Sequence, residues 1–441
     1  MRTSIILLFV TVLRLSAQDP AQDPGQSEKW NLSFQATSIG QYHGSFNSPY
    51  ADALSLQGHP EAEASLTSTL YFGWLLARNT QLYFDPELSG GRGFSGTNGI
   101  ADFPNGEMPR VTIATPKPYL ARLYVTHDFG FGDARESFSS DENQLAGSRP
   151  MTRYSVTIGR FALTDFFDNN RYTHDPRTQF MGWAIMYNGA WDYAADTHGY
   201  TWGWVHEFHT RRWSLRYGSG AMPIVANGLR FDRRVLRDRG DNFEGEVRVK
   251  PGGHDGAIRI LSYQNHARMG TYAEAINLAE ETGTKPDVTA TRRPGTLKYG
   301  FGVSADQELA KDIGVFGRLG WNDGKTESFV FTAIDRLATA GVSVGGARWK
   351  RPHDTAASEL TVSGLSAVHA QYLALGGLDF LIGDGALRYG PEYVSESYYS
   401  ARVMPGVFAT IDLQHVNDPA YNRDRGPVWI GALRLHVEWG R

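Results

Sequence analysis

Apolar and polar residues alternate at every second position along much of this chain, and this pattern restricts the fold more than any other feature. The final segment, residues 428–439, reads VWIGALRLHVEW, and its apolar face carries a Trp at each end. The opposite face carries Arg434, His436 and Glu438. A period of two residues is that of a β-strand. The segment is therefore predicted to be a strand with one face against apolar surroundings and the other against water.

Segments of the same kind recur along the chain, beginning near Trp30. Clear examples are ASLTSTLYFGWLL (64–76), NFEGEVRVK (242–250), LKYGFGVSAD (297–306) and VFATIDLQHV (407–416). About sixteen such segments can be marked, with ends that are uncertain by a few residues. After the N-terminus there is no apolar run of the roughly 18 residues that a transmembrane helix needs. The pattern indicates a chain built almost wholly of strands.

A soluble β-sandwich and a membrane barrel both alternate in this way, so other features must separate them. Aromatic residues gather near the strand ends, where the interfacial girdles of a membrane barrel lie. Few helices are available to cover an apolar sheet face, and closing the sheet leaves no unpaired edge in lipid. We therefore predict an all-β fold, a transmembrane antiparallel β-barrel of sixteen strands, with eighteen as the alternative and short helices in the connections.

The segments between strands also carry signals. Residues 90–117 are rich in Gly and Pro, and residues 133–150 are polar, so both are predicted to be loops. Residues 251–256 fit a tight turn. Residues 272–281 and 365–375 are predicted to be short helices, the second closed by two glycines.

The N-terminus, MRTSIILLFVTVLRLSAQDP, has a positive start, an apolar stretch and small residues at the end. This is the pattern of a secretory signal peptide, with a short buried helix or membrane anchor as the alternative reading. We predict a signal peptide over residues 1–17, a polar tail over 18–29 and a barrel domain over 30–441.

Composition and motifs argue against several function classes. The net charge of −4 gives no general attraction for nucleic acid, and the absence of Cys excludes disulfides and thiol chemistry. The HEFH sequence at 206–209 lacks the spacing of a zinc protease motif, and the GKT at 324–326 lacks the upstream glycine of a phosphate-binding loop. Asp165, Asp168 and Asp175 could form a carboxylate pair for glycoside hydrolysis, but loop turns explain them more simply. No enzyme activity, cofactor or metal is expected.

Long phrases of the chain resemble the carbohydrate-selective porin family of bacterial outer membranes (the OprB type). These phrases are FFDNNRYTHDPRTQF, NGAWDYAADTHGYTWG, SFVFTAIDRLATAGVSVGGARWKRPHDT, GLSAVHAQYLALGGLDFLIGDGALRYGPEYVSESYY and NDPAYNRDRGPVWIGALRLHVEW. The resemblance implies an outer-membrane barrel that lets small neutral sugars diffuse through while its outer face meets lipid. Residues 166–204 would then form the rim and an inward-folding connection, and Trp183, Trp191, Trp202 and Trp204 would serve the interface or stack on solute. The family motif contributes the candidate residues Arg160, Asp168, Asn169, Asp175 and Arg177.

Strand parity adds candidates for the pore lining. The residues on predicted polar faces are Asp85, Glu87, Arg122, Asp128, Arg216, Glu246, Arg248 and Arg318. A generic hydrated lumen with salt bridges is the simpler explanation for each of them. Arg160 shares parity with apolar neighbours, which points it outward unless the strand bulges or ends there. Arg122 and Arg216 are therefore expected to matter more for sugar passage than Arg160.

Several alternatives stay open on the sequence alone. The chain could be a general or anion-preferring porin, since rings of Arg favour anions. It could also be a secreted, soluble β-rich protein that binds or hydrolyses carbohydrate. The sequence does not specify the sugar or whether the protein is a monomer or a trimer. It ends in Gly440-Arg441 rather than in the aromatic residue that is usual for such barrels.

Overall fold

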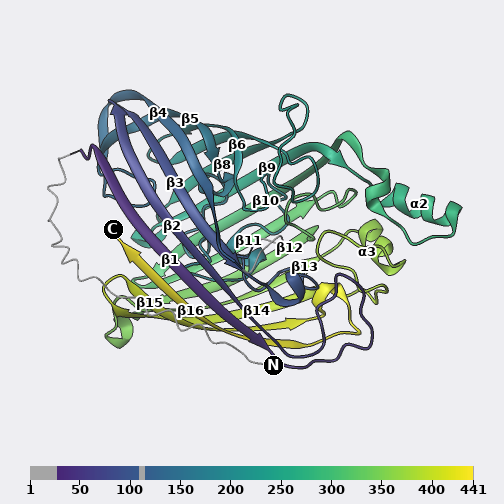
Figure 1. The fold of residues 1–441 in the computed structure, drawn as a ribbon. Helices are drawn as coiled ribbons and strands as arrows, with labels where there is room; N and C mark the ends of the chain where they lie inside the picture. The colour runs from purple at the N-terminus through teal and green to yellow at the C-terminus, as the bar shows by residue number, and fades with distance from the viewer. Residues whose placement is uncertain (1–26, 109–114, 441) are drawn as a thin grey trace.

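The computed structural model describes residues 27–108 and 115–440, and within them sixteen antiparallel strands form one closed barrel (Figure 1). Each strand pairs with its neighbours in sequence, and β1 pairs with β16 to close the sheet. The strands are β1 (Trp30–His43), β2 (Glu61–Ala77), β3 (Thr80–Gly91), β4 (Lys117–Phe138), β5 (Gly147–Phe161), β6 (Thr201–His209), β7 (Trp213–Ala221), β8 (Arg239–Val249), β9 (Gly256–Met269), β10 (Arg293–Ala310), β11 (Ile313–Asn322), β12 (Arg336–Gly345), β13 (Thr355–Gly364), β14 (Glu392–Met404), β15 (Val407–Asn417) and β16 (Val428–Trp439). The predicted fold class and strand number are confirmed.

The closing seam between β1 and β16 is continuous. Its register runs from Phe34 opposite Trp439 to His43 opposite Ile430. On the lumen side, Thr37 Oγ1 and His436 Nδ1 lie 2.8 Å apart in a hydrogen bond. Every strand therefore has a partner on both sides, as a barrel in lipid requires.

In β16 the apolar side chains face outward and the polar side chains face the lumen, as predicted. Leu433 and Leu435 are 66% and 49% exposed on the outer face, whereas Arg434 and His436 are buried on the lumen side. Exposed Trp residues lie near strand ends on the same outer face, at positions 30, 74, 429 and 439. Among the described residues, no helix is long and apolar enough to cross a membrane.

The two ends of the barrel differ in their connections. At the end where β1 begins and β16 ends, adjacent strands are joined by short turns, such as the two-residue links before β3, β11 and β15. Long connections crowd the opposite end (Figure 1). The longest, residues 162–200 between β5 and β6, is called the inner loop below. The expected signal peptide, residues 1–17, lies outside the described residues.

The helices lie in the connections. α1 (Trp183–Met186) belongs to the inner loop, and α2 (Tyr272–Thr282) and α3 (Ala367–Ala374) match the two predicted helices and lie at the long-loop end (Figure 1). Short 3₁₀ turns also occur in the connections, such as Pro251–Gly253 in the predicted tight turn.

The prediction of a loop over residues 133–150 is wrong. β4 and β5 continue as a paired hairpin, with Arg135 opposite Pro150 and Phe138 opposite Gly147, so only residues 139–146 form the turn. Most of this extension of β4 is exposed. Its polar composition suits an extension of the barrel beyond the apolar band, where water meets both faces and the alternation is lost.

The main apolar cluster lies inside the barrel rather than between layers. It joins residues of several connections with lumen-facing strand residues, and includes Phe103, Phe167, Trp191, Tyr193 and Phe331. Trp183 and Trp191 therefore serve the packing of the inner loop, whereas Trp202 is exposed on the outer face. Several of the connections therefore pack against one another inside the barrel.

Candidate functional site

The inner loop crosses the lumen and is held by side chains from the barrel wall. On one side, Arg318 of β11 is fully buried beneath it. Its guanidinium lies 2.9 Å from the Asp168 carboxylate and donates to the backbone carbonyl oxygens of Ile185 and Thr173 at 2.5 and 2.7 Å. A planar group with five donors can satisfy several acceptors at once, so this one side chain fixes three points of the loop.

Two further strands, β14 and β16, also attach the loop. Arg434 of β16 donates to the carbonyl oxygens of Pro176 and Gln179 at 2.8 and 2.6 Å. Glu396 of β14 accepts the backbone N–H groups of Met181 and Gly182 at 2.5 and 2.9 Å. These two side chains satisfy loop backbone that would otherwise be buried without partners. The loop therefore has a defined position.

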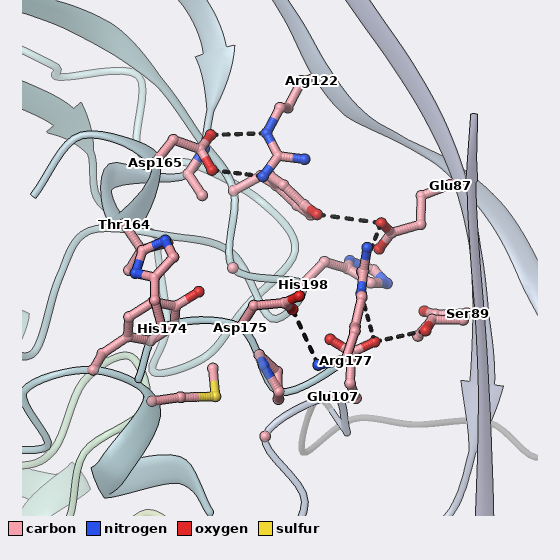
Figure 2. A pocket seen from close by; sticks show the side chains of 18 of the residues that line it. Glu87, Ser89, Glu107, Arg122, Thr164, Asp165, His174, Asp175, Arg177 and His198 are labelled. Atoms are coloured by element: carbon pink, nitrogen blue, oxygen red, sulfur yellow. Dashed lines mark hydrogen bonds and ion pairs between the residues drawn. The ribbon is translucent and has the colours of Figure 1, made fainter. Parts of the chain in front are cut away.

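A channel of about 510 Å³ remains between the inner loop and the wall formed by β1 to β4 (Figure 2). Its lining includes Ser89, near the long-loop end of β3, and residues 142–144 of the turn between β4 and β5. Because these residues belong to opposite ends of the barrel, the cavity follows the direction in which a solute must travel.

One ionic cluster in this channel centres on Arg177 of the inner loop. Its guanidinium lies 3.0 Å from Glu87 of β3 and 2.9 Å from Glu107 of the preceding long connection. It also donates to the hydroxyls of Thr69 and Tyr71, each at 3.1 Å. Figure 2 shows Arg177 reaching from the loop toward Glu87 on the wall. The cluster joins four separate segments of the chain: the inner loop, β2, β3 and the connection after β3.

A second ionic cluster centres on Arg122 of β4. It binds Asp165 of the inner loop through two hydrogen bonds of 2.8 and 2.5 Å (Figure 2). On its other side it lies 3.4 Å from Asp85. The guanidinium also lies over the Tyr200 ring, 5.3 Å from its centre. Such paired, planar geometry is available to Arg and not to Lys.

Aromatic rings accompany these charges. Tyr119 and His198 are stacked with ring centres 4.1 Å apart, and Tyr200 lies beside Tyr119. Burial lowers the pKa of His198 below its usual value, so its ring is neutral at neutral pH. The channel thus combines ring faces with fixed donors and acceptors. In the described residues no group of three or more His, Asp or Glu has an arrangement that could hold a metal ion.

The predicted site residues separate into three groups. Those that line the channel are Glu87, Arg122, Asn169, Asp175 and Arg177. Those that line a second cavity of about 650 Å³ against β7 to β10 are Arg216, Glu246 and Arg248, together with Asn169, which borders both cavities. Those that line neither are Asp85, Asp128, Arg160, Asp168 and Arg318.

The third group consists of buried partners of other charges. Asp85 lies behind Arg122, and Asp128 is bound twice by Arg149 at 2.6 and 2.9 Å. Asp168 and Arg318 attach the inner loop to the wall.

Arg160 follows Gly159, whose φ is +145°. The pairing of β5 continues through both residues, but the alternation of its side chains breaks here, and Arg160 and Phe161 are both buried. Its guanidinium binds Asp196 of the inner loop at 2.6 Å and the Leu120 carbonyl at 2.7 Å. Arg160 therefore supports the loop from outside the channel.

Several lining residues carry no signal in the sequence. Glu107, Tyr119, His198 and Tyr200 belong to long connections or to the irregular strand end, where alternation gives no signal. Asp165 stood out only as a weak candidate for catalysis. Its partner Arg122 lies 43 residues away, and nothing in the local sequence of either residue indicates the pair.

Comparison with known proteins gives one family and a set of related folds. The model of the family described as "Carbohydrate-selective porin, OprB family" matches residues 62–439. No curated protein is similar enough to count as a match.

Among solved structures, the high-pH structure of Pseudomonas putida OprB is 16% identical, with 95% of each chain covered and a TM-score of 0.69. The low-pH structure of the same protein has 12% identity, 93% coverage of each chain and a TM-score of 0.48. Salmonella typhi OmpF in complex with daunomycin is 7% identical, with 94% of this chain and 100% of that chain covered and a TM-score of 0.49.

Proposed function

Because this chain belongs to the OprB family of carbohydrate-selective porins, we propose that small neutral sugars are selected in the channel between the inner loop and β1 to β4. The protein is an outer-membrane channel and not an enzyme. The observation that carries the proposal is the meeting of stacked aromatic rings with two Arg-centred ionic clusters in one passage.

The lining suits the chemistry of a sugar. A pyranose has apolar ring faces and hydroxyl groups around its edge, so it can stack on Tyr119 while its hydroxyls exchange hydrogen bonds with the charged groups. The charges are already paired with one another, so a sugar need only join existing networks. Binding is then weak enough for the solute to leave again, as conduction requires.

Two further features follow from a location in the outer membrane: contact with lipid and export through a signal peptide. The apolar outer faces of the strands, such as that of Leu433 and Leu435, would contact lipid. Export would use the signal peptide expected over residues 1–17.

Swelling of proteoliposomes tests the proposed function directly. Glucose and xylose should enter faster than amino acids of similar size, because only the sugars offer hydroxyl edges together with an apolar ring face. Empty liposomes provide the background rate. Equal rates for sugars and size-matched amino acids would make the protein a general porin and would contradict the proposal.

Replacing Arg122 with Lys is expected to weaken sugar binding while the channel stays open. Lys keeps the charge but loses the paired geometry to Asp165, at a cost of about 1 kcal/mol for one hydrogen bond, or roughly fivefold in affinity. Block of single-channel current by added glucose measures this. Arg160→Lys is the matched control, because Arg160 lies outside the channel.

Arg216→Lys extends the same experiment to the second cavity, where Arg216 pairs with Glu207, Glu244 and Glu246. A loss of sugar block there as well would place both cavities on the sugar's path. Unchanged block in Arg122→Lys would rule out the role given to Arg122.

A further inference from the structure

We propose that this channel passes sugars that carry an amine more readily than sugars that carry a carboxylate, an inference that rests on the proposed function and specifies its substrate class. The lining carries an excess of carboxylates, its arginines are already paired, and its wall contains an acceptor without a donor.

The ionisable groups that line the channel are unequal in sign. The carboxylates are Glu87, Glu107, Glu142, Asp165 and Asp175, and the guanidinium groups are Arg122 and Arg177. Burial lowers the pKa values of His174 and His198, the two histidines of the lining, so they add no positive charge at neutral pH. The formal excess is three negative charges. Rings of Asp and Glu are the feature by which channels favour cations.

The two arginines are already committed to carboxylates. Arg122 binds Asp165 through two hydrogen bonds, and Arg177 lies within 3.0 Å of both Glu87 and Glu107. An incoming carboxylate would have to displace one of these buried partners, and removing one member of a buried ion pair is costly. The lining therefore offers an anion no ready partner.

Asp175 contributes negative charge without a direct ionic partner. Its carboxylate accepts from the Arg177 backbone N–H at 3.0 Å and from Thr178 Oγ1 at 2.8 Å, and it forms no ion pair in the part of the chain that the structure describes. Burial acts to raise its pKa, but the nearby Arg177 guanidinium and these hydrogen bonds outweigh that effect and hold the pKa below its usual value. Asp175 is therefore ionised at neutral pH.

Gln35 of β1 supplies an independent observation. Its side chain is only 3% exposed and lines the same channel. The amide nitrogen donates to the Tyr71 hydroxyl, while Oε1 accepts no hydrogen bond from the described residues. A buried acceptor without a donor costs free energy until a donor arrives. An ammonium group has three donors and no acceptor, whereas a carboxylate has acceptors only, so an uncompensated acceptor in the wall disfavours a carboxylate beside it and not an ammonium group.

The second cavity carries the opposite charge, which shows that the acidity of the channel is local. Its cations are Arg171, Arg211, Arg216, Arg248, Lys250 and Arg259, against the carboxylates Glu246, Asp255 and Asp306. The strand residues in this lining belong to the halves of β8, β9 and β10 near the short turns. The excess of carboxylates is therefore a property of the channel against β1 to β4 and not of the whole lumen.

Two measurements on the reconstituted full chain test the inference. In a KCl gradient at low ionic strength, the reversal potential should show K⁺ preferred over Cl⁻ by roughly tenfold, the lower end of the effect of a cleft lined by one sign of charge. In swelling assays below the pKa of the amine, glucosamine should enter faster than glucose, and glucose faster than glucuronate. A preference for Cl⁻, or equal rates for glucosamine and glucuronate, would overturn the inference.

Variants test whether the lining carboxylates cause the preference for amine-bearing sugars. Asp175→Asn and Glu107→Gln should each lower the ratio of glucosamine to glucuronate entry and shift the reversal potential toward zero. Glu281→Gln is the matched control, since it removes the same charge from the exposed helix α2, outside the channel (Figure 1).

The order of entry rates of glucosamine, glucose and glucuronate through the wild-type protein tests the inference even if a variant fails to assemble. Passage of glucose without any discrimination by charge overturns only this inference. Failure of glucose to pass faster than a size-matched amino acid contradicts the proposed function itself.

Discussion

Replacing Leu433 with Arg is expected to prevent stable assembly of the barrel in the membrane. Leu433 lies in the middle of β16 on the outer face and is 66% exposed. An arginine on the lipid-facing surface near the midplane costs roughly 2–4 kcal/mol. The fraction of protein that migrates as a folded barrel in unheated detergent gels should fall sharply, and the midpoint of urea unfolding in vesicles should fall with it.

A substitution at the end of the same strand, near the membrane surface, is the control. Trp429 lies on the same face of the same strand but at its end, where an arginine should cost no more than about 1 kcal/mol. Leu435→Arg should behave like Leu433→Arg. If either leucine variant inserts normally while the lumen-side change Arg434→Leu abolishes insertion, the assignment of faces is wrong.

Replacing Arg318 with Met is expected to release the inner loop from the wall. Arg318 is buried and connects Asp168 with two backbone carbonyls of the loop, and Met removes all of these bonds while retaining an unbranched chain. Leaving the Asp168 carboxylate buried without its partner costs about 3–5 kcal/mol. Single-channel conductance should rise and block by glucose should decrease, because the loop no longer narrows the lumen.

The control for this change is Arg248→Met in the second cavity. Arg248 pairs with Glu246 on the wall and forms no hydrogen bond or ion pair with the inner loop among the described residues. It should leave conductance and sugar block near the wild-type values. Unchanged conductance in Arg318→Met, in barrels that assemble normally, would mean that other attachments alone position the loop.

Strands and their faces could be predicted because alternation is a local property. A few consecutive residues are enough to show the alternation of polar Arg434 and His436 with apolar Leu433 and Leu435. The membrane requires the same pattern in every strand. The helix of residues 272–282 was predictable for the same reason, since its signals lie within its own sequence.

The site could be predicted only in part, because it depends on contacts between distant segments. Parity placed Arg318 correctly toward the lumen, but its partner Asp168 lies 150 residues earlier, so its role beneath the loop has no local signal. Asp85 also faces inward, yet Arg122 and Asn143 cover it. A position on the polar face of a strand indicates that a residue faces away from lipid. It does not indicate whether water, a loop or a solute covers that residue.

The seam between the first and last strands has a consequence for how the molecule forms. Thr37 and His436 are 399 residues apart in the chain, yet they share a hydrogen bond. Bringing such distant points together costs about 5 kcal/mol of chain entropy when nothing between them is ordered. Each hairpin formed between neighbouring strands shortens the free chain and reduces that cost. The β1–β16 contact is therefore the last to become favourable, and its formation closes the wall. Folding is of high contact order and slow, and the finished barrel is a single cooperative unit.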